Sequence, residues 1–223
     1  MAHPRALRAV AFAACSLPLA KLGVDAFSGG LGANPVEAIL NRLGFWTLTL
    51  LVASLAATPA HDLLGLSWPV RVRRLVGLFA FTYATAHLVF YVAVDQVFDW
   101  RVLWADVTKR RFMVVGFTAW LALLPLAVTS TDRWVRRLGF TRWKRLHRLA
   151  YAAGALGVVH FLWRVKADRT RPLAFAAVLA GLFLARLPAA VARARRIRAR
   201  AQPMAARPWP ETATRGRGAP TST

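Results

Sequence analysis

The stretch LVGLFAFTYATAHLVFYVAV, residues 75–94, is uncharged from end to end and contains a single histidine, His87. A helix that crosses a lipid bilayer needs roughly 17–25 mostly apolar residues, so this stretch is long enough to span a membrane. Five further stretches have a similar length and character: 6–27, 43–60, 112–129, 149–165 and 172–190. We therefore expect an all-α, polytopic membrane helix bundle of about six transmembrane helices.

The segments between these stretches are short and charged, which leaves no room for a second domain. We expect residues 1–192 to form one transmembrane domain. Residues 193–223 form a basic tail rich in Arg, Pro, Gly and Thr, which is typical of disordered segments. The first stretch also resembles a signal peptide, and Cys15 faintly resembles a lipoprotein cleavage site. We favour an uncleaved first span because it makes the number of helices even.

The net charge of +22 is distributed unevenly along the chain. If the N-terminus is cytoplasmic, segments 1–8, 61–74, 130–148 and 186–223 face the cytoplasm and carry 21 of the 31 Lys and Arg residues. The positive-inside rule therefore places both termini in the cytoplasm. The arginines of the tail are most simply explained as contacts with anionic membrane lipids, so we expect no nucleic-acid partner.

Missing motifs exclude several classes of cofactor protein. The single cysteine, Cys15, excludes an intrachain disulfide, a thiolate zinc site and a Cys-ligated iron–sulfur cluster. The sequence contains no Cys-x-x-Cys-His motif, so it carries no covalently attached c-type haem. It also contains no Walker loop and no Gly-x-Gly-x-x-Gly, so no nucleotide-binding domain is visible.

Two histidines inside the predicted spans suggest a metal centre, because ionisable residues within a membrane are costly and usually functional. His87 lies about eight residues from the outer end of the third span, and His160 about five from the outer end of the fifth. Facing imidazoles from two helices are haem ligands in electron-transfer cytochromes. We predict that His87 and His160 hold haem b, with Arg164 one turn further out to pair with its propionates.

Small residues share a helix face with each histidine, and they have two interpretations. They usually indicate close helix packing, but they would also leave room for a flat macrocycle between the helices. On the third span the small residues are Gly77, Ala80 and Ala84, and on the fifth they are Ala153 and Gly157.

A second redox site is predicted near the inner face. His147 precedes His160 by thirteen residues, which is about 20 Å along a continuous helix. At the corresponding depth the third span offers Arg73 rather than a histidine, so the second ligand stays open between His61, an arginine or none. Arg73 would neutralise a haem propionate or a flavin phosphate. The alternative is that His147 and Arg73 only anchor helix ends at the lipid headgroups.

Two other functional classes compete with electron transfer. One is a transporter that moves a metal ion or a proton past intramembrane histidines, and the other is a structural assembly factor. Cation pathways usually contain intramembrane Asp or Glu, and no acidic residue lies within the last five predicted spans. This distribution favours the redox interpretation.

The motifs around these residues resemble the MsrQ (YedZ) family over roughly residues 20–190. The most specific block runs from WKRLHRLAY at 143–151 to HFLWRVK at 160–166. It is preceded by RRLVGL at 73–78, KRRF at 109–112, Gly116 and PLAVTS at 125–130. This family is the haem-binding membrane subunit of a periplasmic methionine sulfoxide reductase system.

The resemblance implies a ferric reductase-like transmembrane domain in a bacterial inner membrane, with one or two haem b groups and a cytoplasmic FMN. It implies that electrons come from the quinone pool or a cytoplasmic flavin reductase. They would leave to a periplasmic molybdopterin-containing subunit that reduces methionine sulfoxide in oxidised proteins, so this chain needs no catalytic site for that substrate. His87, His147, His160 and Arg73 are the implied cofactor residues. Related oxidases have a fourth histidine where Arg73 stands, and a flavin and nicotinamide domain that this chain lacks.

Overall fold

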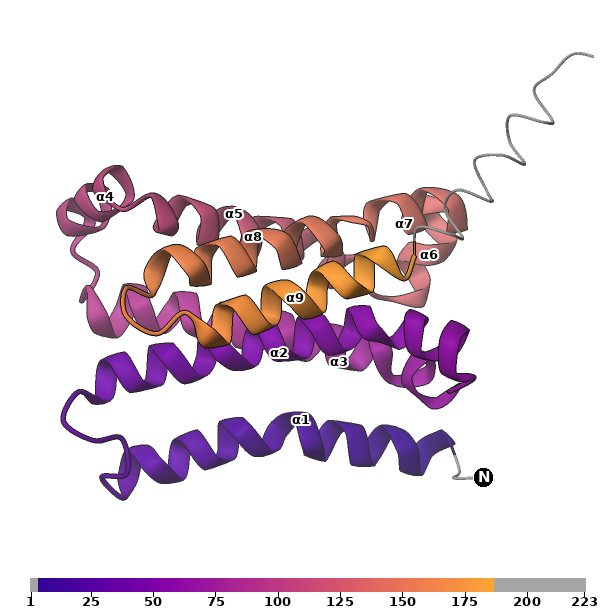
Figure 1. The fold of residues 1–223 in the computed structure, drawn as a ribbon, viewed down its shortest axis with the longest axis horizontal. Coiled ribbons are helices and arrows are strands. Elements are labelled where there is room, and N and C mark those ends of the chain that lie inside the picture. The colour runs from indigo at the N-terminus through magenta and orange to yellow at the C-terminus, as the bar shows by residue number, and fades with distance from the viewer. Residues whose placement is uncertain (1–3, 187–223) are drawn as a thin grey trace, which may run out of the picture. The chain divides into compact units, whose positions relative to one another are not determined.

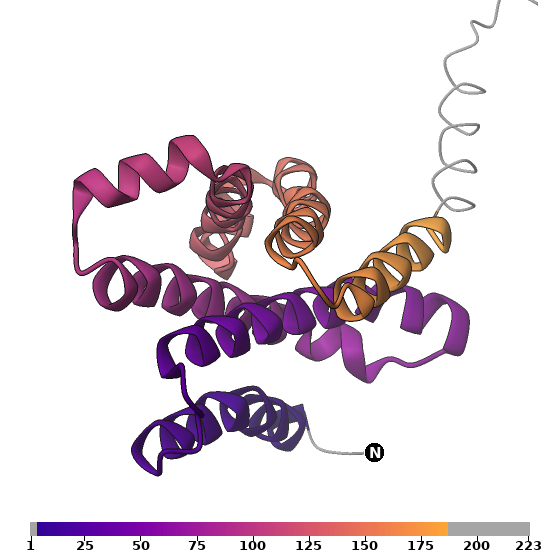
Figure 2. The ribbon, with the colours of Figure 1, turned by 60° about the vertical axis from the view of Figure 1, so that its left-hand side comes forward.

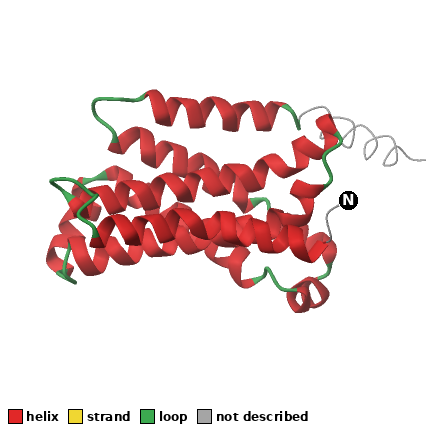
Figure 3. Cartoon of the chain, turned by 90° about the horizontal axis from the view of Figure 1, so that it is seen from below, coloured by secondary structure: helices red, strands yellow, loops and turns green. Residues whose placement is uncertain are grey.

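The computed structural model describes residues 4–186, and within that range the chain folds into helices with no strand (Figure 3). This confirms the predicted all-α fold class. The elements are α1 (Pro4–Phe27), α2 (Pro35–Leu64), α3 (Trp68–Phe90), the π-helical turn η1 (Tyr91–Asp95), α4 (Trp100–Lys109), α5 (Arg111–Val128), α6 (Asp132–Leu138), α7 (Phe140–Leu146), α8 (Leu149–Arg164) and α9 (Thr170–Leu184).

Helices lie at all six predicted apolar stretches, although their lengths differ. Within residues 4–186, α1, α2, the run from α3 through η1, and α5 are long and apolar enough to cross a membrane. Helices α8 and α9 have 16 and 15 residues, slightly fewer than the roughly 17 that a perpendicular crossing needs. The chain is a multi-pass membrane protein, and its helices are consistent with about six spans. The end of the last predicted span and the basic tail lie outside the described residues.

Three short helices occupy segments that look like charged loops in the sequence. Each is too short and too polar to produce a spanning pattern, but α4 and α6 begin at residues that cap them. The Asp99 carboxylate accepts hydrogen bonds from two backbone N–H groups of α4, and the Thr131 hydroxyl accepts one from α6. On α4, Trp100 and Trp104 are each 72% exposed, which suits a helix at the membrane–water interface.

The long helices alternate in direction, so α3 and α8 run the same way through the bundle (Figure 1). We call one end of the bundle the α4 end; it also holds the α1–α2 and α8–α9 loops. The opposite end, with α6 and α7, is the α7 end (Figure 1). Figure 2 shows α5 and α8 lying alongside each other, away from α1. Residues 87 and 160 therefore come late in two parallel helices, nearer the α4 end.

Helix α2 is the central element, because it contributes to both apolar cores. One core joins α1, α2, α3 and α5 through residues such as Leu51, Tyr83 and Leu123. The other joins α2 to α8 and α9 through residues such as Leu48 and Val158. Helix α1 is attached at the edge, where the Tyr83 hydroxyl donates a hydrogen bond of 2.8 Å to the Cys15 carbonyl. This packing holds α3 and α8 in a constant relation to α2.

Candidate functional site

The structure brings His87 of α3 and His160 of α8 together. Their ring centroids lie 6.4 Å apart and the ring planes are nearly perpendicular, at 89°. With metal–nitrogen bonds of about 2 Å, as in zinc sites, two imidazoles on one metal ion have ring centres about 6 Å apart. The observed separation would therefore allow both rings to bind one metal ion, and both rings are half-buried.

Each of these two rings is oriented by a backbone carbonyl of a neighbouring helix. Nδ1 of His87 lies 3.0 Å from the carbonyl oxygen of Leu40 on α2. Nδ1 of His160 lies 2.7 Å from the carbonyl oxygen of Phe112 on α5. A donating Nδ1–H leaves Nε2 unprotonated, and this is the tautomer in which metal-ligating histidines are usually held. Both rings are thus prepared to offer Nε2 to a metal.

A glycine lies beside each of these carbonyl contacts, and one of the two glycines is needed for its contact. Gly44 follows Leu40 by four residues and Gly116 follows Phe112 by four, so each lies one helical turn beyond the accepting carbonyl. A Cβ atom at Gly116 would lie 2.5 Å from Nδ1 of His160, whereas one at Gly44 would lie 3.4 Å from Cε1 of His87. The first distance is a clash and the second is an ordinary contact.

Sequence patterns did not assign a role to either glycine. Gly116 entered only as part of the family resemblance, and Gly44 was not singled out. The one local signal is a glycine in the interior of an apolar helix, where it costs about 1 kcal/mol relative to alanine and therefore requires a packing reason.

The small residues on the histidine faces could serve either close helix packing or room for a macrocycle. The glycines among them serve close packing. A Cβ atom at Gly77 would lie 3.2 Å from the Ser54 hydroxyl oxygen, and one at Gly157 would lie 3.2 Å from Leu48. Both neighbours belong to α2, so these glycines face that helix closely and do not border open space. Small residues here let α3 and α8 approach α2.

His147 is not part of α8, which corrects the expected geometry of the inner site. It ends α7, and α8 begins at Leu149 after a turn at residues 147–148. The distance of about 20 Å, which assumes one continuous helix from His147 to His160, therefore does not apply. The turn forms because His147 and Arg148 end the α7 hydrogen-bond pattern: their backbone N–H groups bond to the carbonyls of Trp143 and Arg145.

The His147 ring is held firmly but has one nitrogen without a partner. Its Nδ1 lies 3.1 Å from the Trp143 carbonyl oxygen, and its ring centroid lies 3.9 Å from that of Trp143. Trp143 is anchored in turn by a 2.9 Å hydrogen bond from its indole N–H to the Thr129 carbonyl. Among residues 4–186, Nε2 of His147 is buried and has no hydrogen-bond partner. A buried polar atom of this kind requires an explanation, and a metal is one.

The arginines near His147 are positioned from α3. Burial lowers the pKa of His147 below its ordinary value, and the charges of Arg73 and Arg74 lower it further, so the ring is neutral at pH 7. Within the described part of the chain, the Arg73 guanidinium makes only a long, 3.5 Å contact with the Thr58 hydroxyl. Arg74 pairs with Asp132 at 2.7 Å. His61 is exposed and contacts Asp62 at 3.1 Å.

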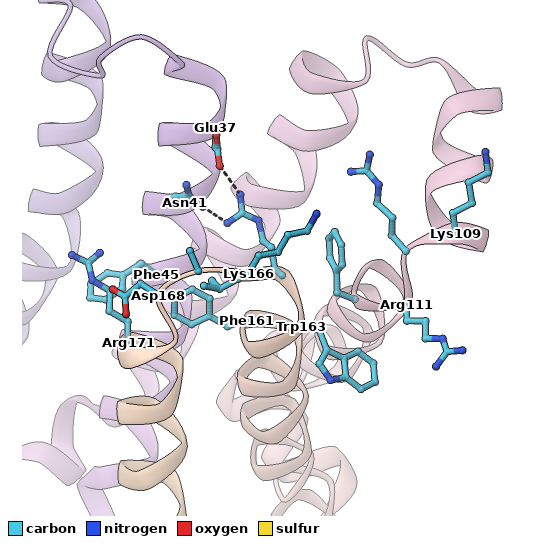
Figure 4. A pocket seen from close by; sticks show the side chains of 15 residues that line it. Glu37, Asn41, Phe45, Lys109, Arg111, Phe161, Trp163, Lys166, Asp168 and Arg171 are labelled. Atoms are coloured by element: carbon cyan, nitrogen blue, oxygen red, sulfur yellow. Dashed lines mark hydrogen bonds and ion pairs between the residues drawn. The ribbon is translucent and has the colours of Figure 1, made fainter.

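Arg164 lies one helical turn beyond His160, at the α4 end. Its guanidinium donates a hydrogen bond to the Asn41 side chain and lies 3.6 Å from the Glu37 carboxylate (Figure 4). The predicted contact with a propionate stays a prediction, and the group that pairs with Arg164 in the structure is a carboxylate of its own chain. Within residues 4–186 no three His, Cys, Asp or Glu side chains form a cluster that could hold a metal ion.

Comparison with known proteins shows the family to which this chain belongs. Residues 43–158, about half of the chain, match the family described as ferric reductase like transmembrane component. A protein of Rhodospirillum rubrum named protein-methionine-sulfoxide reductase heme-binding subunit MsrQ is 53% identical over 192 residues. That alignment covers 86% of this chain and 92% of the relative.

The chain belongs to the MsrQ family. Two further MsrQ proteins bearing the same full name agree with this assignment. The MsrQ of Caulobacter vibrioides is 48% identical, over 78% of this chain and 83% of its own length. The MsrQ of Deinococcus radiodurans is 50% identical, over 77% of this chain and 84% of its own length. The predicted family and its ferric reductase-like transmembrane domain are therefore confirmed.

Proposed function

We propose that this chain is a transmembrane electron-transfer subunit that holds haem b between His87 and His160. The observation that carries the proposal is the close pair of imidazole rings, whose centroids lie 6.4 Å apart and each of which has Nδ1 bonded to a backbone carbonyl. The names of its relatives, which are called heme-binding subunits, support the same cofactor. A bound haem would supply a carrier that takes up and releases one electron at a time.

The protein's own residues supply position and environment for that carrier. The carbonyls of Leu40 and Phe112 hold the two imidazoles in the metal-binding tautomer. The glycine at 116 lets α5 approach His160 closely enough to make its bond. Arg164, placed one turn beyond His160, would balance the negative charge of propionates at the α4 end.

We further propose that His147 and Arg73 belong to a second site at the α7 end. The unpartnered Nε2 of His147 supports a metal ligand there, as either a second haem or a single-histidine site. The Arg73 guanidinium has a single long hydrogen bond to the residues that the structure describes, which suits a role in binding a propionate or the phosphate of FMN. FMN itself rests on the family resemblance alone.

The direction of transfer follows from the proposed orientation. The α7 end, rich in Arg and Lys, would face the cytoplasm of a bacterial inner membrane and take electrons from quinol or a cytoplasmic flavin reductase. The α4 end would face the periplasm and deliver them to a molybdopterin-containing methionine sulfoxide reductase subunit. Both chain termini would then be cytoplasmic.

Reporter fusions measure this orientation directly. A fusion after residue 140 is expected to be active only as a cytoplasmic reporter, and one after residue 168 only as a periplasmic reporter. The expectation rests on the uneven distribution of Lys and Arg along the chain. The opposite pattern would reverse the proposed electron path.

Electron transfer across the bilayer tests the function itself. The haem-loaded chain is reconstituted into phosphatidylcholine vesicles that contain ferricyanide, and chemically reduced FMN is added outside. We expect the trapped ferricyanide to be reduced far faster than in vesicles without protein. Haem-loaded vesicles that reduce it no faster than empty ones would rule out the function and leave a purely structural or transport role.

The variant His147→Ala separates the two proposed sites in the same assay. We expect it to keep the low-spin haem spectrum of the His87–His160 site while losing most of the transfer from reduced FMN. His147 contributes no hydrogen bond to either of the other two histidines, so their site should persist. Unchanged transfer and unchanged cofactor content in both His147→Ala and Arg73→Ala would leave these residues only an anchoring role.

A further inference from the structure

A large cleft opens at the α4 end of the bundle, between α2, α5, α8 and the start of α9 (Figure 4). Its volume is about 1240 Å³, which exceeds the roughly 300–1,000 Å³ of ordinary small-molecule sites. The cleft is open to the outside, and its wall includes the α8–α9 loop. It is thus wide enough to admit part of another macromolecule.

The lining of this cleft is strongly cationic. It includes six basic side chains and only two acidic ones, Glu37 and Asp168. Of the basic residues, Arg164 pairs with Glu37 and Arg110 with Asp106. Lys109, Arg111 and Lys166 are exposed, and none of their side chains has a hydrogen bond or ion pair among the described residues. The full basic set is Lys109, Arg110, Arg111, Arg164, Lys166 and Arg171.

The floor of the cleft touches the candidate redox site. Phe112 lines the cleft, its ring centroid lies 5.8 Å from that of His160, and its carbonyl holds the His160 ring. Phe161, the residue after His160, also lines the cleft. Among the described residues, one aromatic side chain therefore separates the cleft from a proposed iron ligand. A protein bound in the cleft would therefore lie close to the proposed haem.

We propose that this cationic cleft is the docking surface for an acidic patch on the electron-accepting protein. The proposal rests on the proposed function, which requires an electron-accepting partner. It adds the face of this chain to which the partner binds and the charge of the partner's surface. Charge complementarity of this kind steers association and sets orientation. Exposed Trp163 and the clustered arginines have the composition of protein interfaces. A concave wall built from four segments favours a protein over a flat layer of lipid headgroups.

The test measures binding of the purified methionine sulfoxide reductase subunit to the full chain in nanodiscs of phosphatidylcholine. The double variant Lys109→Glu/Lys166→Glu reverses two unpaired charges in the cleft without touching the histidines. At low salt we expect its affinity to fall about tenfold or more, because electrostatic steering contributes at least that much. The difference should shrink as salt screens the charges. The matched control is Arg133→Glu/Arg136→Glu, on exposed α6 at the opposite end, which should bind like the unaltered chain.

A second readout uses small electron acceptors on chain that has first been reduced. One electron passes from the ferrous haem iron to each acceptor, and re-oxidation is followed by absorbance. The cleft variant should react more slowly with anionic ferricyanide and faster with cationic hexaammineruthenium(III), while the control variant changes neither rate.

The possible outcomes separate the docking proposal from the proposed function. Equal behaviour of the cleft and control variants in chain that holds haem would overturn the docking proposal alone. So would a cleft variant that loses only its affinity for phosphatidylglycerol vesicles, since the cleft would then serve lipids. An unaltered chain that binds no haem would overturn the docking proposal together with the function on which it rests.

Discussion

Replacing His87 by alanine is expected to remove most of the haem from the purified chain, and His160→Ala is expected to do the same. Each substitution deletes one of two imidazoles whose centroids lie 6.4 Å apart. Loss of a group that merely supports a metal ligand weakens metal affinity by about 10–100-fold, so loss of the ligand itself should cost more. The measurements are haem per chain and the low-spin absorption spectrum.

The matched control for these variants is His61→Ala. His61 is exposed and its ring contacts only the neighbouring Asp62 in the described part of the chain. We expect this variant to retain the haem of the His87–His160 site. Circular dichroism and gel filtration of all three variants would separate loss of cofactor from loss of fold. Full low-spin haem in both His87→Ala and His160→Ala would contradict the proposed ligand pair.

The variant Gly116→Ala is expected to weaken haem binding by about 10–100-fold, although it removes no ligand. The new Cβ atom would lie 2.5 Å from Nδ1 of His160, so the ring must move and lose its bond to Phe112. Helix propensity alone would favour the alanine variant, since alanine stabilises a helix by about 1 kcal/mol relative to glycine. Haem titration of the purified chain measures the affinity.

Two other glycines provide comparison variants for Gly116→Ala. A Cβ atom at Gly181 on α9 would meet nothing within 4 Å, so Gly181→Ala should leave haem affinity unchanged. Gly44→Ala should have a smaller effect than Gly116→Ala, because its Cβ would stay 3.4 Å from the His87 ring. If the three variants behave alike, the close approach of α5 to His160 has no part in haem binding.

The pairing of His87 with His160 illustrates how far sequence patterns reach. Counting residues from the end of each apolar stretch placed both histidines at a similar depth, and the structure brings their rings together. Depth is predictable because rise per residue is constant in a helix and the membrane sets where a span ends.

The inner site shows where the same counting fails. The extrapolation from His160 back to His147 assumed one helix, but the chain turns at residues 147–148. Hydrogen bonding at the end of α7 determines that turn, and hydrophobicity does not report it. The same limitation hid α4, α6 and α7, whose short polar sequences carry no spanning pattern.

Short stretches of the sequence predict the all-α membrane fold, the approximate spans and the identity of the candidate ligands. Apolar length, charge bias and a histidine inside a span are each properties of a few consecutive residues. Only the tertiary structure shows the carbonyl that orients each ring, the glycine that leaves room for the His160 ring and the cationic cleft beside that ring. His87 and Leu40 are 47 residues apart, and His160 and Phe112 are 48 apart. Such contacts depend on how helices pack against one another, and no local pattern encodes that packing.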